Sequence, residues 1–225
     1  MIAVDLPDLP RWVEAHGIAT DPAGWRTPVG AGFALGHDTA KLIVVVGDAA
    51  VEAVRELAHD HPSHTLLLEI EREQLAEAVR RAGRGVDRAL LHTLPDPDTL
   101  PELEGADPLP AEASLAHVPA ELATELEAAR ASHTVWTAWV DGEPVSFAYA
   151  PWRSARWFDV SVDTLAGARQ LGLATLVAAA MIRDERGRGR EPVWGADEHN
   201  VASIRLAKRL GFVESDAIWV CPGAG

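Results

Sequence analysis

The stretch that decides the fold runs from Asp159 to Ala174 and reads DVSVDTLAGARQLGLA. We interpret it as a strand ending near Thr164, a loop, and the start of an apolar helix over residues 171–182. Free N–H groups and the helix dipole favour an anion at such a start, and small residues at Gly172 and Ala174 let a phosphate approach closely. The pattern predicts an anion cradle, although tight packing of the helix on a sheet would also explain the small residues.

Hydrophobic periodicity on both sides of this stretch predicts strands and helices in alternation. After it we expect a strand at 192–196, a helix at 200–210 and a strand at 212–220. Before it we expect a helix at 119–130 and strands at 134–140, 145–150 and 157–162. Asp141-Gly142 would form the tight turn between the first two of these strands, because glycine accepts a positive φ readily.

The N-terminal part predicts an α/β sheet. Its expected strands are 41–47, 64–70 and 86–94, separated by helices at 48–60 and 71–82. The glycine-rich residues 30–36 precede their strand, whereas a nucleotide loop follows one, so we interpret them as a hairpin. Residues 96–110 contain four prolines and five acidic residues, which is typical of a boundary. We therefore expect an accessory α/β lobe at 1–95, a linker at 96–111 and a second domain at 112–225.

Two motifs of this second domain resemble those of the GNAT superfamily of acyl-coenzyme-A-dependent N-acetyltransferases. Arg169 to Ala174 (RQLGLA) matches that family's Q/R-x-x-G-x-G/A loop, and 160–165 looks like the strand before it. Residues 200–212 (NVASIRLAKRLGF) resemble its second motif. The resemblance covers about residues 115–220 and implies a mixed, mostly antiparallel sheet flanked by helices, here beside the N-terminal α/β lobe.

The resemblance also implies acetyl-CoA as cosubstrate, lying between two splayed strands and giving its acetyl group directly to an amine. Backbone groups near Val162 and Thr164 would hold the pantetheine arm, and N–H groups from Gln170 to Thr175 the pyrophosphate. The implied coenzyme-binding residues are Val162, Asp163, Thr164, Arg169, Gln170, Leu171, Gly172, Leu173, Ala174, Thr175, Asn200 and Ser203. Asn200 has a structural alternative, because asparagine is a strong helix N-cap.

Direct transfer needs a base for the ammonium. Asp159 and Glu198 are our candidates, with His199 beside the latter, although each could equally be a solvated surface residue. The family's frequent tyrosine acid falls on Ala207, and the only tyrosine, Tyr149, is expected in the middle of another strand. A coenzyme thiolate could leave unaided, since thiol pKa values lie near 8.5.

His59, His61 and His64 could suggest a metal, but a loop of solvated histidines is the commoner case, and we expect no metal site. Trp136, Trp139, Trp152 and Trp157 are mostly core in our interpretation, and an aromatic wall over a cationic amine is a second role for them.

The net charge of −14 argues against nucleic-acid binding. Residues 1–150 hold 25 acids and 10 bases, and 151–225 hold 9 acids and 10 bases. This asymmetry predicts a small cationic amine as acceptor, although acidity also serves solubility. A single cysteine excludes a disulfide framework, and without a long apolar run or a secretory signal we expect no membrane partner and a cytoplasmic protein. The alternatives are a non-catalytic acyl-CoA-binding module or a protein N-terminal acetyltransferase, and homodimerisation stays open.

Overall fold

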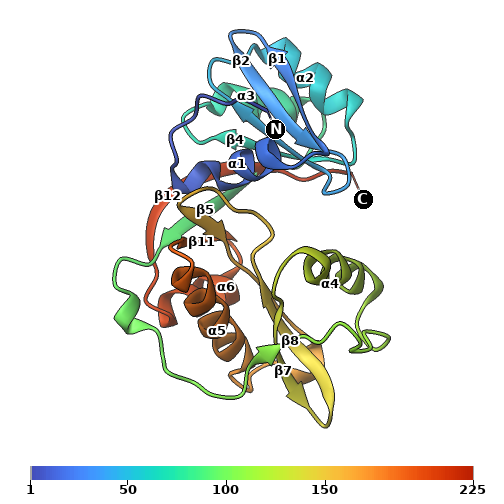
Figure 1. Cartoon of the computed structure of the whole chain (residues 1–225). Coiled ribbons are helices and arrows are strands. Elements are labelled where there is room, and N and C mark those ends of the chain that lie inside the picture. Colours follow the sequence, from blue (N-terminus) through green and yellow to red (C-terminus); the bar gives the residue numbers. More distant parts are fainter. Residues whose placement is uncertain (1, 225) are drawn as a thin grey trace. The chain divides into compact units, whose positions relative to one another are not determined.

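The computed structural model describes residues 2–224, which divide into two compact units (Figure 1). Unit 1 comprises residues 2–91, 195–201 and 214–224, and unit 2 comprises residues 92–194 and 202–213. This division differs from the contiguous domains expected from the sequence. The reason is strand pairing, because the C-terminal strand β12 (Val213–Cys221) pairs antiparallel with β4 (Thr65–Glu69) of unit 1.

Unit 1 is built on a sheet with the strand order β1-β2-β3-β4-β12-β5. Its remaining elements are α1 (Val13–Thr20), β1 (Gly24–Val29), β2 (Gly32–His37), β3 (Leu42–Val46), α2 (Val51–Asp60), α3 (Glu73–Arg81) and β5 (Asp87–Thr93). The glycine-rich residues 30–36 supply the turn and strand β2 of a hairpin, as predicted, whereas its first strand β1 lies before them and was not predicted. Helix α1 was not predicted, because its buried residues Val13, Ala15, Ile18 and Ala19 do not follow a clear helical stripe.

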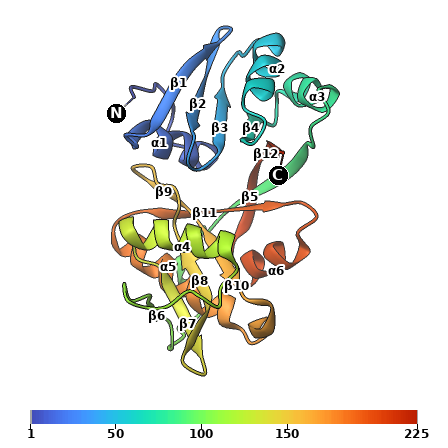
Figure 2. The same ribbon diagram turned by 90° about the vertical axis from the view of Figure 1, so that its right-hand side faces the viewer.

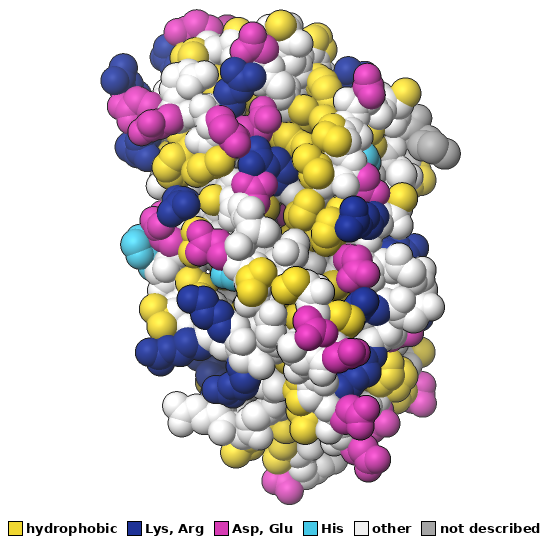
Figure 3. Space-filling view, turned by 90° about the vertical axis from the view of Figure 1, so that its left-hand side faces the viewer, with side chains coloured by type: hydrophobic (Ala, Val, Ile, Leu, Met, Phe, Trp, Pro, Cys, Tyr) yellow, Lys and Arg dark blue, Asp and Glu magenta, His cyan; other side chains and the backbone are white. Residues whose placement is uncertain are grey.

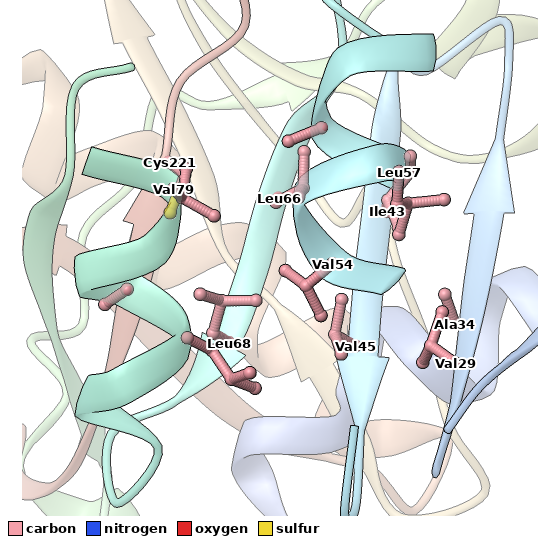
Figure 4. Packing of buried hydrophobic residues seen from close by; sticks show 13 residues of the cluster. Val29, Ala34, Ile43, Val45, Val54, Leu57, Leu66, Leu68, Val79 and Cys221 are labelled. Atoms are coloured by element: carbon pink, nitrogen blue, oxygen red, sulfur yellow. The ribbon is translucent and has the colours of Figure 1, made fainter. Parts of the chain in front are cut away.

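The core of unit 1 lies between the sheet and helices α2 and α3 (Figure 4). Alternate strand residues such as Ala34, Ile43 and Val45 meet Val54 and Leu57 of α2. Cys221 is fully buried in the same cluster. The intervening residues Leu35, Val44 and Leu67 are also buried, so both faces of this sheet are covered.

Unit 2 is built on a sheet with the strand order β10-β8-β7-β6. Helices α4 and α5 cover its opposite faces (Figures 1 and 2). The elements are β6 (Asp107–Pro108), α4 (Ala120–Ser132), β7 (Trp136–Val140), β8 (Glu143–Tyr149), β9 (Trp157–Asp159), β10 (Ser161–Thr164), α5 (Leu173–Gly187), β11 (Glu191–Asp197) and α6 (Val201–Arg209). The mixed, mostly antiparallel architecture agrees with the prediction.

Two local predictions in unit 2 have different outcomes. Asp141 and Gly142 have φ values of 52° and 85°, which confirms the tight turn between β7 and β8. The expected boundary segment 96–110 is not free of regular structure, because it contains a 3-10 turn (Pro97–Thr99) and β6, which pairs with β7. Proline fits this two-residue edge strand, since an edge position needs fewer N–H donors.

The two units share one succession of elements. In each, a helix is followed by an antiparallel hairpin, a third strand antiparallel to the hairpin, a crossover helix, and a strand parallel to the third. The order is α1-β1-β2-β3-α2-β4 in unit 1 and α4-β7-β8-β9/β10-α5-β11 in unit 2. The chain therefore repeats one topology twice. Within residues 2–224, no helix combines the length and apolar character needed to cross a bilayer.

Candidate functional site

The first feature of the site is the start of α5. Gly172 is the N-cap, with φ 81°, and Gln170 also has a positive φ of 67°. These left-handed residues turn the loop so that the first N–H groups of the helix have no partner inside it. Thr175 differs from the prediction, because its N–H already donates to the carbonyl of Gly172 at 3.1 Å. The cradle is thus formed by the backbone around Gly172, Leu173 and Ala174.

The loop before the cradle contributes one charged side chain. Arg169 is exposed, and its Nε donates to the carbonyl oxygen of Thr164 at 3.3 Å. This contact ties the cradle to the end of β10. Leu171 is 61% exposed, which is unusual for a large apolar residue and places it on the surface of the loop.

The second feature is a break in the strand that precedes the cradle. We expected one strand at 157–162, but Val160 separates β9 from β10. Strand β9 pairs in parallel with β11, and the last link is the N–H of Val160 to the carbonyl of Val193 at 3.0 Å. Strand β10 instead pairs antiparallel with β8 and is the last strand of its sheet. Parallel pairing therefore ends here, as a splayed pair of strands requires.

Backbone alternation separates the three predicted residues of β10. The N–H of Leu165 donates to Val145 of β8, so the backbone of Asp163 faces β8 as well. Val162 and Thr164 lie at alternate positions, on the side to which Val160 donates its N–H. Their backbone groups are therefore placed for an extended ligand along the edge of the sheet, and that of Asp163 is not.

Asp159 lies at the end of β9, next to the break. Its side chain is half-buried, and its backbone N–H donates to the carbonyl of Trp152 at 3.0 Å. Burial raises the pKa of Asp159 to about 6, and a backbone hydrogen bond from Val160 only partly opposes this. Such a carboxylate is ionised at neutral pH and basic enough to accept a proton.

Glu198, the other candidate base, lies in unit 1 after β11. Arg88 reaches its carboxylate at 3.5 Å, and His199 lies 3.8 Å away. The carboxylate of Glu198 therefore has a cationic partner, whereas no ion pair of the described residues includes Asp159. Asp159 is therefore the stronger candidate for the base.

The second motif is placed at α6. Asn200 directly precedes the helix, the position of an N-cap, and its N–H donates to Asp197 at 2.9 Å. Ser203 accepts a hydrogen bond from the indole N–H of Trp194 at 2.9 Å, so its hydroxyl has a structural partner. Residue 207 is a fully buried alanine, and its methyl group has no proton to donate.

Tyr149 is the last residue of β8 and not in its middle as expected. Its hydroxyl donates to Glu125 of α4 at 3.0 Å. Burial raises its pKa above the ordinary value. The pKa of Asp163, on the same face of the sheet, is also raised, first by burial and then by the charge of Glu125. Glu125 gave no sequence signal, because it is one of several exposed acids on its helix.

Two other predicted groups lie elsewhere. His61 and His64 come together with Asp38 in unit 1, with one ligand atom from each within 4.8 Å of the others. Asp38 there accepts hydrogen bonds from Trp25 at 2.8 Å and shares one with His64 at 3.2 Å. The tryptophans form no single wall, since Trp136 reaches Asp184 of α5 and Trp139 packs in the cluster beneath α4.

Comparison with known proteins supports this geometry. Residues 136–220 match the family described as GNAT acetyltransferase. Among curated proteins, no sequence matches the chain. A solved GCN5-related N-acetyltransferase from Kribbella flavida is similar, with 19% identity, a TM-score of 0.66, and coverage of 96% of this chain and 95% of the other.

Two further solved structures have the same fold. A GCN5-related N-acetyltransferase-like protein from Streptococcus suis has 17% identity and a TM-score of 0.65, covering 95% of this chain and 98% of the other. A tandem GNAT protein from the clavulanic acid biosynthesis pathway has 15% identity and a TM-score of 0.53, covering 96% and 94%. At these identities the likeness shows the fold, which here spans both units.

Proposed function

We propose that this protein transfers an acetyl group from acetyl-CoA directly to the amine of a small cationic acceptor, since residues 136–220 match the GNAT acetyltransferase family. Two neighbouring features carry the proposal. The parallel pairing of β9 with β11 ends at Val160, and the edge strand β10 that follows leads to the helix start at Gly172. A helix start of this kind favours a pyrophosphate, and an unpaired strand edge favours an extended amide-containing arm.

The residues fit the coenzyme as follows. The backbone of Gly172, Leu173 and Ala174 would hold the pyrophosphate, and Arg169 would add a positive charge beside it. Backbone groups of Val162 and Thr164 would hold the pantetheine arm and polarise the reacting carbonyl. When bound, acetyl-CoA supplies a thioester carbon for the amine to attack and a thiolate that departs.

Asp159 would supply the base. It would take a proton from the acceptor's ammonium, so that the neutral nitrogen can form the new C–N bond while the C–S bond breaks. No residue of unit 2 is assigned as the acid, because Ala207 occupies the usual position and Tyr149 is bonded to Glu125. The thiolate would leave as an anion, since a thiol ionises near pH 8.5.

A covalent route through cysteine is disfavoured. Cys221 is fully buried in unit 1, and burial raises its pKa to about 12. Its thiol would therefore be a poor nucleophile at neutral pH. We expect Cys221→Ala to retain turnover if the fold is retained.

The acidic body of the chain favours a cationic acceptor. Over the face shown in Figure 3, acidic and basic side chains are interspersed, so the net charge alone does not locate the acceptor. Glu125 and Asp163 supply the local acidity, because they lie close enough for one charge to raise the pKa of the other. An ammonium would relieve this repulsion.

The coenzyme half of the proposal is tested by titrating acetyl-CoA calorimetrically into the wild type, Gly172→Glu and Gly189→Glu. Gly189 is a matched control, because it also has a positive φ, 84°, with open space around its Cα, but follows the other end of α5. We expect Gly172→Glu to abolish binding by placing a carboxylate in the cradle, and Gly189→Glu to retain it. Equal affinity in all three proteins would overturn the proposal.

The transfer half is tested by measuring coenzyme thiol release with a panel of cationic, neutral and peptide amines. The buried Ala207, where an acid is usual, favours the alternative of a non-catalytic acyl-CoA-binding module. Coenzyme binding without turnover on any amine would support that alternative. Turnover confined to peptides would instead indicate protein N-terminal acetylation.

A further inference from the structure

A cavity of about 540 Å³ lies entirely within unit 1. Its walls come from the N-terminal segment, the 3-10 turn Pro10–Trp12 before α1, the beginning of β2, the ends of β3 and β4, and one residue of β12. The function proposed above assigns no role to this cavity. Its volume is in the range of small-molecule sites, about 300–1,000 Å³.

The repeated topology explains why a cavity forms at this place. Strands β3 and β4 are parallel, and their pairing ends at Val44 and Leu67 although both strands continue. The cavity is lined by the residues just beyond, including Val46, Gly47 and Glu69. In unit 2 the corresponding pair, β9 and β11, stops pairing in the same way before the cradle. The cavity thus occupies, in unit 1, the topological position of the coenzyme site in unit 2.

This position in unit 1 is not suited to a pyrophosphate. The segment between β3 and α2 is Gly47-Asp48-Ala49-Ala50, which has no counterpart of the Arg169–Ala174 loop. Asp48 lies in this segment, two residues before the N-cap Ala50, and Glu52 lies in the first turn of α2. Carboxylates at a helix N-terminus satisfy the dipole themselves and repel a second anion.

The polar lining of the cavity is acidic. Glu69 accepts the N–H of Gly47 at 3.1 Å and lies 3.8 Å from Arg72, both through Oε2. Its Oε1 has no hydrogen bond from the described residues. Asp5 also lines the cavity and is exposed. Arg72 is shared with Asp48, at 2.9 Å, so it neutralises Glu69 only in part.

The one basic residue of the lining, Arg11, is already neutralised. Its guanidinium donates to both oxygens of Asp216 at 2.5 Å and to Glu71 at 2.8 Å. Two carboxylates therefore balance this single cation. Asp216 is occupied by that contact, which leaves Glu69 and Asp5 as the acidic groups that can meet a ligand.

The rest of the lining is apolar. It includes Leu6, Leu9, Trp12, Phe33 and Val46, and Leu9 is 46% exposed. Arg26 lies over the Phe33 ring at 4.3 Å and donates to the carbonyl of Ala3 at 3.2 Å, so it has partners of its own. We propose that this cavity binds a small organic cation with an apolar body, its ammonium facing Glu69 and Asp5.

The proposal is tested by isothermal titration of three probes that share an indole body, without acetyl-CoA. Tryptamine carries an ammonium, tryptophol a hydroxyl, and indole-3-propionate a carboxylate. We expect tryptamine to bind at least tenfold more tightly than tryptophol, and indole-3-propionate not to bind, because a carboxylate partner rewards the ammonium and repels the anion.

Two variants test whether the ammonium of tryptamine binds beside Glu69 and Asp5. Glu69→Gln keeps an acceptor for the N–H of Gly47 but removes the charge, and we expect tryptamine affinity to fall about tenfold or more. Asp5→Asn, at an exposed residue, should lower it severalfold without affecting folding. Glu56→Gln is the matched control, because Glu56 is an exposed acid of α2 outside the lining, and it should leave the affinity unchanged.

Equal affinity for tryptamine and tryptophol, or unchanged tryptamine affinity in both Glu69→Gln and Asp5→Asn, would overturn the inference. Loss of tryptamine affinity in Asp163→Asn of unit 2, with no loss in Glu69→Gln or Asp5→Asn, would do so as well, because the amine would then bind at the proposed acceptor site. These outcomes do not depend on acetyl transfer. Failure of the transferase proposal appears instead as absent coenzyme binding or absent thiol release.

Discussion

Arg153 donates two hydrogen bonds to one carboxylate oxygen of Glu185, at 2.6 and 3.1 Å, and so ties the loop after β8 to the last turn of α5. The Glu185 side chain is only 3% exposed. Arg190 reaches its second oxygen at 3.2 Å. A buried carboxylate with two cationic partners holds the helix that begins at the cradle.

Glu185→Gln should lower the free energy of unfolding by about 3 kcal/mol, because it leaves two half-buried guanidinium groups without their buried charge partner. Urea unfolding followed by circular dichroism measures this. The control is Glu127→Gln on α4, whose ion pair with Arg130 is half exposed and should cost about 1 kcal/mol or less. An equal loss of unfolding free energy in Glu185→Gln and Glu127→Gln would show that the buried ion pairs of Glu185 contribute no more than an exposed one.

The same carboxylate predicts a pH dependence of stability. Burial opposes its ionisation, but the hydrogen bond and charge of Arg153 outweigh burial and lower the pKa of Glu185 below its ordinary value. A lowered folded-state pKa stabilises the fold above the unfolded value, about 4.3, and that stability is lost as pH falls through the folded-state pKa. The difference in unfolding free energy between wild type and Glu185→Gln should therefore shrink below about pH 4.

Asp159 should govern the pH dependence of turnover. Because burial raises its pKa to about 6, the base is protonated and inactive below that pH. We expect kcat/KM to rise with pH through about 6 in the wild type, and Asp159→Asn to lose most turnover along with this limb of the profile. Glu198→Gln is the matched comparison. If the pH profile of kcat/KM changed in Glu198→Gln but not in Asp159→Asn, Glu198 and not Asp159 would be the base.

The raised pKa of Asp159 also has a consequence for stability. The native state binds its proton more tightly than the unfolded chain does, so ionisation disfavours the fold as pH rises from about 4 through about 6. Asp159→Asn should therefore be at least as stable as the wild type at pH 7.5. Thermal unfolding at pH 7.5 and pH 5 measures this, and marked destabilisation at both values would assign Asp159 a structural role.

Tyr149→Phe tests whether the only tyrosine takes part in the reaction. Its hydroxyl bonds Glu125 and its pKa is raised, which makes it a poor proton donor to a thiolate. We expect turnover within a few-fold of the wild type and a stability loss of about 1 kcal/mol for the lost hydrogen bond. A drop of a hundredfold or more in kcat, with KM unchanged, would instead make Tyr149 the acid.

Arg84 should contribute to the stability of unit 1. Its guanidinium donates to carbonyl oxygens of Ala58, His64, Cys221 and Pro222, and so joins the ends of α2 and β12 to the start of β4. Arg84→Met should cost about 2–3 kcal/mol, because several buried carbonyls lose their donor. Arg81→Met, an exposed neighbour whose partner is Glu77, is the control and should cost less than 1 kcal/mol.

The sequence by itself determined the local elements of this protein. The hairpin turn at Asp141-Gly142 and the cradle at Gly172 depend on which residues accept a positive φ, which is a property of a few neighbouring residues. The strands and helices of both units follow hydrophobic periodicity in the same local way. These elements were predicted within a few residues, apart from α1, β1, the short β6 and the break between β9 and β10.

Only the tertiary structure decided which of those elements pair and which side chains meet. Strand β12 pairs with β4, more than 140 residues away, and Glu125 meets Tyr149 across 24 residues. The raised pKa of Asp159 and the acidic cavity at Glu69 arise because folding removes water and gathers side chains from distant segments. Burial and long-range strand pairing are properties of the packed chain, and no local pattern of residues contains them.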